Sequence, residues 1–127
     1  MLVKQVIVVR KDLKMRRGKE IAQGSHASIA FLSFLARKSL LSAKPIELTL
    51  AQTEWINGIF KKVCLQVNSE QELLDIHERA LSKGLDVYLI KDSGLTEFNG
   101  IATITCLAIG PDEDSKIDEV TGTLSLY

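Results

Sequence analysis

The sequence predicts an α/β fold in which a mixed sheet of about four strands carries helices on both faces. Short runs of β-branched and apolar residues recur four times, and most of the segments between them show helical spacing. The last two runs are joined by a loop without a helix, so we expect that pair of strands to be antiparallel. A length of 127 residues fits one domain, residues 1–127, with a core of its own.

The elements are expected in the order strand, helix, helix, strand, helix, strand, strand, helix. The expected strands cover residues 5–10, 63–67, 87–91 and 103–109. The expected helices run from Gly18 to about residue 38, from Thr49 to about residue 57, from Ser69 to Gly84, and from the acids at 112–114 to Val120. Ser69 and Glu72 are expected to form a capping box, and Gly110 with Pro111 to end the fourth strand.

The first helix carries two stripes of residues at helical spacing. Small and apolar residues predict the core-facing stripe, which consists of Ala22, Ser25, Ile29, Leu32 and Ala36. Lys19, Gln23 and His26 form a second, polar stripe at the edge of that face. Beyond Ala30 the helix is apolar nearly all round, which predicts that this half is buried in the core or covered by a second subunit in a homodimer.

Composition argues against several classes of protein. No apolar run approaches the length of about 20 residues that a membrane span needs, and a strand-like run stands at the start in place of a signal peptide. We therefore expect a cytoplasmic protein without a membrane partner. Cys64 and Cys106 are expected to be reduced core thiols, and His77 an exposed helix residue. No cofactor fingerprint or metal-ligand spacing occurs, so we expect no cofactor and no metal.

Charge is balanced over the chain but unevenly distributed. Residues 1–20 carry seven cations against two acids, whereas residues 108–127 carry five acids against one cation. A basic patch beside the start of the first helix is suited to hold phosphates. A simply solvated loop is the alternative, and charge alone does not decide between them.

Two strand ends carry polar residues of the kind that form sites at the carboxyl edge of an open α/β sheet. The basic loop and the polar stripe follow the first strand, and the segment D-S-G-L-T at residues 92–96 follows the third. If those strands are neighbours, Asp92 reaches His26, orients its ring and lets it activate a water. Lys19 would then neutralise an oxyanion or hold a phosphate, and Thr105 would donate a further hydrogen bond. The alternatives are that D-S-G is only a turn and His26 a structural or surface residue.

Four segments extend this interpretation. They are K-Q-V-I-V-V-R-K-D-L-K-M-R-R-G-K-E-I-A-Q-G-S-H-A (residues 4–27), K-D-S-G-L-T-E (91–97), T-C-L-A-I-G-P (105–111) and I-D-E-V-T-G-T-L-S-L-Y (117–127). Together they resemble the type II peptidyl-tRNA hydrolases, in the family's order and over nearly the whole chain. Leu95 is a departure, because the family usually has a basic or polar residue there.

The resemblance implies a mixed sheet flanked by helices, and hydrolysis of the ester that joins a peptide to the 3′-terminal ribose of tRNA. The residues that match the family's site are Lys19, Gln23, His26, Asp92, Thr96 and Thr105. We hypothesise that His26 and Asp92 prepare the water and that Lys19 stabilises charge. Gln23 and Thr105 would position the ester.

In this reading the substrate and partner is peptidyl-tRNA. The basic loop, with Lys14, Arg16 and Arg17, would contact the tRNA backbone. One alternative is a non-catalytic module on the same fold that holds tRNA or a protein without turnover. Another is hydrolysis of a different acyl ester or amide, which the same fold could host.

Overall fold

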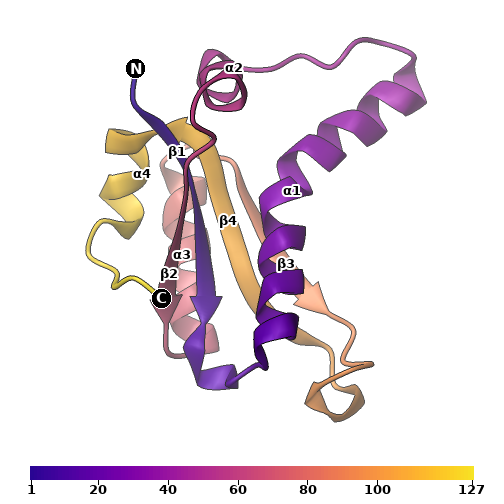
Figure 1. Cartoon of the computed structure of the whole chain (residues 1–127), viewed down its shortest axis with the longest axis vertical. Coiled ribbons are helices and arrows are strands. Elements are labelled where there is room, and N and C mark those ends of the chain that lie inside the picture. Colours follow the sequence, from indigo (N-terminus) through magenta and orange to yellow (C-terminus); the bar gives the residue numbers. More distant parts are fainter.

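The computed structural model describes residues 1–127 and forms one sheet with helices packed against it (Figure 1). The strands are β1 (Val3–Arg10), β2 (Lys62–Val67), β3 (Val87–Asp92) and β4 (Thr103–Glu113). The helices are α1 (Arg17–Ser42), α2 (Leu50–Asn57), α3 (Glu70–Ser82) and α4 (Asp114–Thr121), with short 3-10 turns η1 (Lys11–Leu13) and η2 (Phe98–Gly100). None of these helices combines the length and apolar character needed to cross a membrane.

The sheet is mixed, as the sequence predicts, with the strand order β2-β1-β4-β3. Strand β1 pairs in parallel with β2, and β4 runs antiparallel to both β1 and β3. The first and third strands are therefore not neighbours, because β4 lies between them. They still end at the same edge of the sheet, since both run antiparallel to β4.

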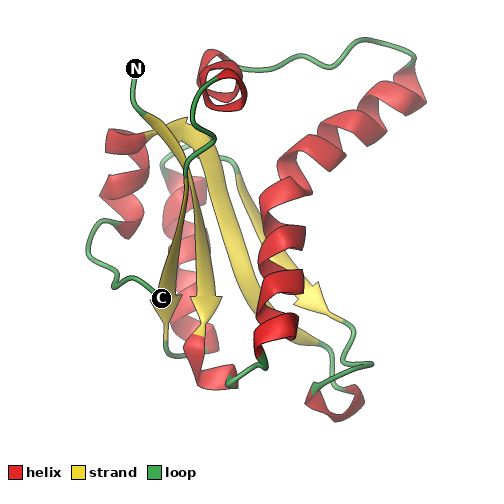
Figure 2. Ribbon diagram, viewed as in Figure 1, coloured by secondary structure: helices red, strands yellow, loops and turns green.

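Helices cover both faces of the sheet (Figure 2), as expected. The α1 face carries the smaller apolar cluster, in which Ile7, Ile90 and Cys106 pack with Ala27 of α1. The opposite face carries the larger cluster, built by alternate residues of the same strands together with α3 and α4. Its fully buried members include Val6, Val8, Leu73, Leu107, Ile109 and Ile117. Because strand side chains alternate between faces, β1 is buried on both sides.

The predicted core face of α1 is wrong. The residues that the helix buries are Gln23, Ala27 and Phe31, whereas Ala22, Ser25 and Ile29 of the predicted stripe are exposed. Spacing alone misassigns this face because one of its three buried residues is Gln23. A glutamine is buried only where hydrogen-bond partners meet its amide.

A second buried glutamine, which lies on the sheet, also fixes α1 to the sheet. Gln5 of β1 is fully buried; its amide Nε2 donates to the carbonyl of Ser28 at 2.9 Å, and the Ser28 hydroxyl donates back to Oε1 at 2.6 Å. This reciprocal pair sets the rotation of α1 about its own axis, because both amide atoms of Gln5 must find partners in a dry interface.

Local differences from the sequence prediction have physical causes. Strand β4 does not end at Gly110 but continues to Glu113, because its last residues pair with the start of β1 across a bulge. At α3 the Ser69 hydroxyl accepts from Glu72 N–H as expected, but the Glu72 carboxylate accepts from the N–H of Asn68 in place of Ser69. The other expected cap is present: Thr49 and Gln52 form a capping box at α2.

Two cysteines, a histidine and a tryptophan are placed as follows. Cys64 is exposed and only Cys106 is a core thiol, and both are free. His77 on α3 is half-buried and makes no hydrogen bond, where an exposed residue was predicted. Trp55 is buried, and its indole N–H donates to the carbonyl of Lys61 at 2.7 Å.

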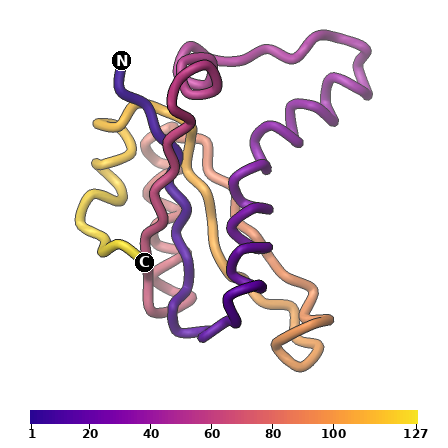
Figure 3. The backbone as a smooth tube through the Cα atoms, in the orientation of Figure 1, coloured from indigo at the N-terminus to yellow at the C-terminus, as the bar shows by residue number.

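The outer half of α1 leaves the sheet, and the following loop arches back to α2 (Figure 3). Phe34, Leu40 and Leu41 are 54%, 83% and 90% exposed. The chain itself therefore buries Phe31 but leaves these three residues of the apolar half exposed, and their coverage by a second subunit stays a prediction.

Candidate active site

The ammonium group of Lys19 is the centre of a polar cluster at the edge where β1 and β3 end. Lys19 lies in the first turn of α1, and Asp92 is the last residue of β3. Lys19 Nζ donates to Asp92 Oδ1 at 2.8 Å and to Thr96 Oγ1 at 2.7 Å. The Lys19 and Asp92 side chains are only 12% and 11% exposed. The two strand ends predicted from the sequence to carry the site therefore meet here, through Lys19.

Asp92 is held on both of its oxygens. Oδ2 accepts from the backbone N–H of Gly94 at 2.8 Å, and Oδ1 receives the Gln23 amide at 3.4 Å besides Lys19. The Lys19 hydrogen bond lowers the pKa of Asp92 below its ordinary value, with help from Gly94 and against the opposing effect of desolvation. The group is therefore a carboxylate at neutral pH. A carboxyl with a lowered pKa is a weak proton acceptor, and Asp92 is better suited to hold Lys19 than to deprotonate water.

A β-bulge brings Thr105 into the cluster. Ile90 pairs with Cys106 and Lys91 pairs with Ile104, which leaves Thr105 as the extra residue of β4. Its hydroxyl, fully buried, donates to Gln23 Oε1 at 2.5 Å. This bond fixes the Gln23 amide so that its Nε2 points at Asp92. Bulges re-aim side chains in this way beside active sites.

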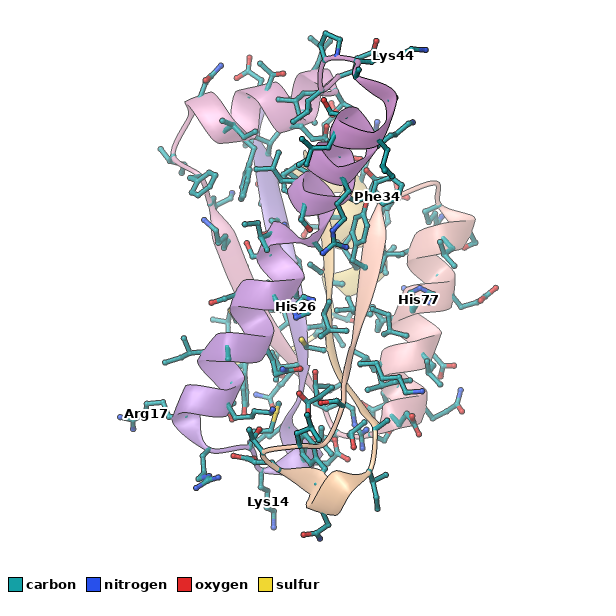
Figure 4. The ribbon with its side chains drawn as sticks, turned by 90° about the vertical axis from the view of Figure 1, so that its right-hand side faces the viewer. Lys14, Arg17, His26, Phe34, Lys44 and His77 are labelled. Atoms are coloured by element: carbon teal, nitrogen blue, oxygen red, sulfur yellow. The ribbon has the colours of Figure 1, made fainter.

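His26 lies apart from this hydrogen-bonded cluster. It is exposed on α1 (Figure 4) and makes no hydrogen bond or ion pair. The sequence interpretation expected Asp92 to orient the imidazole of His26. In this structure Asp92 pairs with Lys19 instead. At helical spacing His26 follows Lys19 and Gln23 on the same side of the helix, two turns or about 10 Å along the axis from Lys19.

The basic loop lies at the same end of α1. Figure 4 shows Lys14 and Arg17 there, with Lys44 at the opposite end of the helix and His26 between. Lys14 and Arg17 are exposed and have no carboxylate partner, whereas Arg16 pairs with Glu97 at 2.8 Å although its side chain is 81% exposed. Of the predicted substrate-binding cations, two are thus unpaired and one is partly neutralised.

Comparison with known proteins identifies the fold and the family. The family model described as peptidyl-tRNA hydrolase PTH2 matches residues 3–127. The chain belongs to the PTH2 family. It is 46% identical to the peptidyl-tRNA hydrolase of Methanopyrus kandleri, over 98% of this chain and 98% of that one. The peptidyl-tRNA hydrolase of Methanocaldococcus jannaschii is 43% identical over 98% and 99% of the two chains.

A solved structure shares the fold of this PTH2 chain at low sequence identity. It is a protein of unknown function from Agrobacterium tumefaciens strain C58, 14% identical, with a TM-score of 0.61 over 100% of this chain and 98% of that one. At this identity the likeness shows the fold alone.

The sequence analysis did not predict three neighbours of the polar cluster. The backbone N–H of Gly94 donates to Asp92. The D-S-G segment could have predicted this contact, because an Asp side chain in such a turn accepts from the N–H two residues on. Phe98 lies 6.0 Å from Lys19 Nζ by its ring centroid, and Glu97 binds Arg16. No local pattern predicts these last two contacts, because both come from the loop after β3 folding back over α1.

A large apolar cavity lies on the other side of α1. It has a volume of about 750 Å³ and is lined mainly by apolar side chains, among them Ile29, Trp55 and Phe60. None of the six residues matched to the family site lines it. The hydrogen-bonded cluster, and not this cavity, is where the ionisable groups converge.

The lowered pKa of Asp92 predicts how stability depends on pH. A folded-state pKa below the unfolded one gives stability that is present above the unfolded value of about 3.9 and is lost as pH falls through the folded pKa. At pH 7 Asp92→Asn is expected to lower the free energy of unfolding by about 2–4 kcal/mol, because it leaves the nearly buried Lys19 unpaired. By pH 3 the difference from wild type should shrink.

Urea unfolding at both pH values measures this difference. Asp118→Asn is the matched control, because its ion pair with Lys4 has a carboxylate that is 52% exposed and should contribute at most about 1 kcal/mol. Losses of equal size for the two variants at pH 7 would contradict the account.

Proposed function

We propose that this chain hydrolyses the ester that joins a peptide to the 3′-terminal ribose of tRNA, without a metal. The observation that carries the proposal is the third N–H of Lys19. An ammonium has three donors, and Asp92 and Thr96 occupy two of them. The remaining donor is held in place and is free to meet the oxyanion that forms when water adds to the ester carbonyl. Membership of the PTH2 family supports the substrate.

In the proposed reaction water is activated between His26 and the Lys19–Asp92 pair. The water oxygen forms a bond to the carbonyl carbon while the imidazole of His26 takes a water proton. The bond from that carbon to the ribose oxygen then breaks, and the proton passes from His26 to the ribose oxygen. The products are a carboxylic acid on the peptide, which loses its proton to solvent and becomes a carboxylate, and a free hydroxyl on the tRNA. His26 suits this role because no protein group occupies its ring nitrogens.

The other residues of the cluster keep Lys19 and the ester in position. Asp92 acts by fixing the ammonium, since both of its oxygens are already engaged. Gln23 and Thr105 form a rigid amide–hydroxyl pair below it, and Thr96 orients Lys19 from the loop. The groups gathered here are one carboxylate, one ammonium, an amide and hydroxyls, and this set lacks the clustered His, Cys and carboxylate ligands of a zinc site.

Hydrolysis of an N-acetylated aminoacyl-tRNA tests these roles. His26→Ala should lower kcat/KM by about 10²–10⁴-fold, because the water then lacks its proton acceptor. His77→Ala is the matched control, since that histidine lies on α3 across the sheet (Figure 4), and it should leave the rate unchanged.

Equal rates for wild type and His26→Ala would remove the assigned role of the imidazole. A wild type that binds the tRNA and releases no amino acid would favour the alternative, a binding module on the same fold.

The unpaired cations of the basic loop give a separate prediction for tRNA affinity. Each phosphate contact contributes about 0.7–0.9 to the slope of log Kd against log salt. Lys14→Ala/Arg17→Ala should therefore weaken binding and flatten the slope by about 1.5, and Arg16→Ala should do less because Glu97 already pairs with it. Lys44→Ala removes one positive charge at the far end of α1 and should leave the slope unchanged. An unchanged slope in the loop variant would exclude this loop from the tRNA site.

A further inference from the structure

One side of α1 forms an uncharged strip that leads away from the polar cluster along β3. Its members on the helix recur at helical spacing after Lys19 and Gln23, namely His26, Ala30 and Phe34. Contacts on either side of His26 and Ala30 hold the helix against β3: Lys19 bonds to Asp92 in the polar cluster, and Phe34 packs against Tyr88. We call these residues, His26 to Phe34 with Tyr88, the α1–β3 strip.

An aromatic pair closes the far end of the strip. The rings of Phe34 and Tyr88 lie 6.3 Å apart at an angle of 51°. Phe34 is 54% exposed, Tyr88 is half-buried, and the Tyr88 hydroxyl makes no hydrogen bond. The pair therefore offers apolar surface and one free hydroxyl to whatever lies on the strip.

Charge decides which part of the substrate lies there. A peptidyl-tRNA ester joins a polyanion to a largely uncharged peptide, and the two extend in different directions from the reacting carbon. The cations of the basic loop lie on one side of the cluster, at the end of α1 that Lys14 and Arg17 mark in Figure 4. The strip lies on the other side, and between Lys19 and Arg37 none of its members carries a fixed charge. Phosphates suit the first direction and a peptide the second.

We propose that the α1–β3 strip holds the peptide of peptidyl-tRNA in an extended form, with Phe34 and Tyr88 contacting one of its side chains. This inference rests on the proposed function. A pair of aromatic rings can contact many different apolar side chains. Such contacts add affinity with little sequence preference, and a substrate whose peptide varies in sequence requires this.

The geometry gives the length of peptide that reaches the pair. From His26 to Phe34 the helix rises about 12 Å at 1.5 Å per residue. Along β3, the four steps from Tyr88 to Asp92 span about 13 Å. An extended peptide covers about 3.3 Å per residue, so the pair is reached by the side chain about four residues from the ester.

The apolar cavity on the other side of α1 is the competing location for the peptide. Ile29 lines it and is 57% exposed, close to the 54% of Phe34. Ile29→Ala is therefore the matched control: it removes a similarly exposed apolar side chain from the same helix, on the opposite side.

The experiment measures kcat/KM on one tRNA esterified with N-acetylated peptides of one to eight residues. Each peptide is built of alanine with a single leucine at a varied distance from the ester. Phe34→Ala and Tyr88→Ala should each lose about three- to tenfold when the leucine lies about four residues from the ester, chiefly through KM. Ile29→Ala should lose nothing at any length.

The outcomes separate the strip from the proposed function. A loss that does not depend on peptide length would mean that the aromatic pair contacts the single-stranded 3′ end of the tRNA or only supports the fold, and would overturn the inference. A length-dependent loss in Ile29→Ala in place of Phe34→Ala would move the peptide to the cavity. A wild type that hydrolyses no substrate of the series would overturn the proposed function itself.

Discussion

The ion pair between Lys19 and Asp92 joins the first turn of α1 to the end of β3. Both side chains are nearly buried, so each needs the other: removing one partner leaves an uncompensated charge out of water, which costs far more than the pair contributes by its presence. This requirement brings together two segments separated by 73 residues in the sequence. It also explains why the ammonium is ordered enough to present its third donor, which a solvated lysine at a surface is not.

The rest of the α1 interface supports that pair with polar contacts. Gln23 meets Thr105 at the bulge of β4, and Gln5 of β1 exchanges two hydrogen bonds with Ser28. Two buried glutamines are unusual in so small an interface, and each fixes the rotation of α1 more sharply than apolar packing does, because a hydrogen bond is directional. The helix consequently carries Lys19 to within 2.8 Å of Asp92, although much of its outer half has left the sheet.

The sequence predicts the order of the elements, the mixed sheet and most of the residues of the polar cluster. It fails on which face of α1 is buried. The spacing of small and apolar residues favours another face, because the buried face contains Gln23, whose amide finds its hydrogen-bond partners on β3 and β4. It also assigns the partner of Asp92 to His26, because local spacing does not reveal that β4 separates β1 from β3 or that Lys19 lies nearer. The contacts of Phe98 and Glu97 depend on how the loop after β3 folds back, which no local pattern encodes.

The central claim is that Asp92 acts on the reaction through Lys19. A double-mutant cycle on kcat/KM for N-acetylated aminoacyl-tRNA, with Lys19→Ala, Asp92→Asn and the two combined, tests it most directly. The account predicts that the double variant is no worse than Lys19→Ala alone, within about twofold, because the carboxylate has nothing left to position. Losses that multiply, so that the double variant falls by the product of the two single effects, would show that Asp92 has a separate role and would contradict the account.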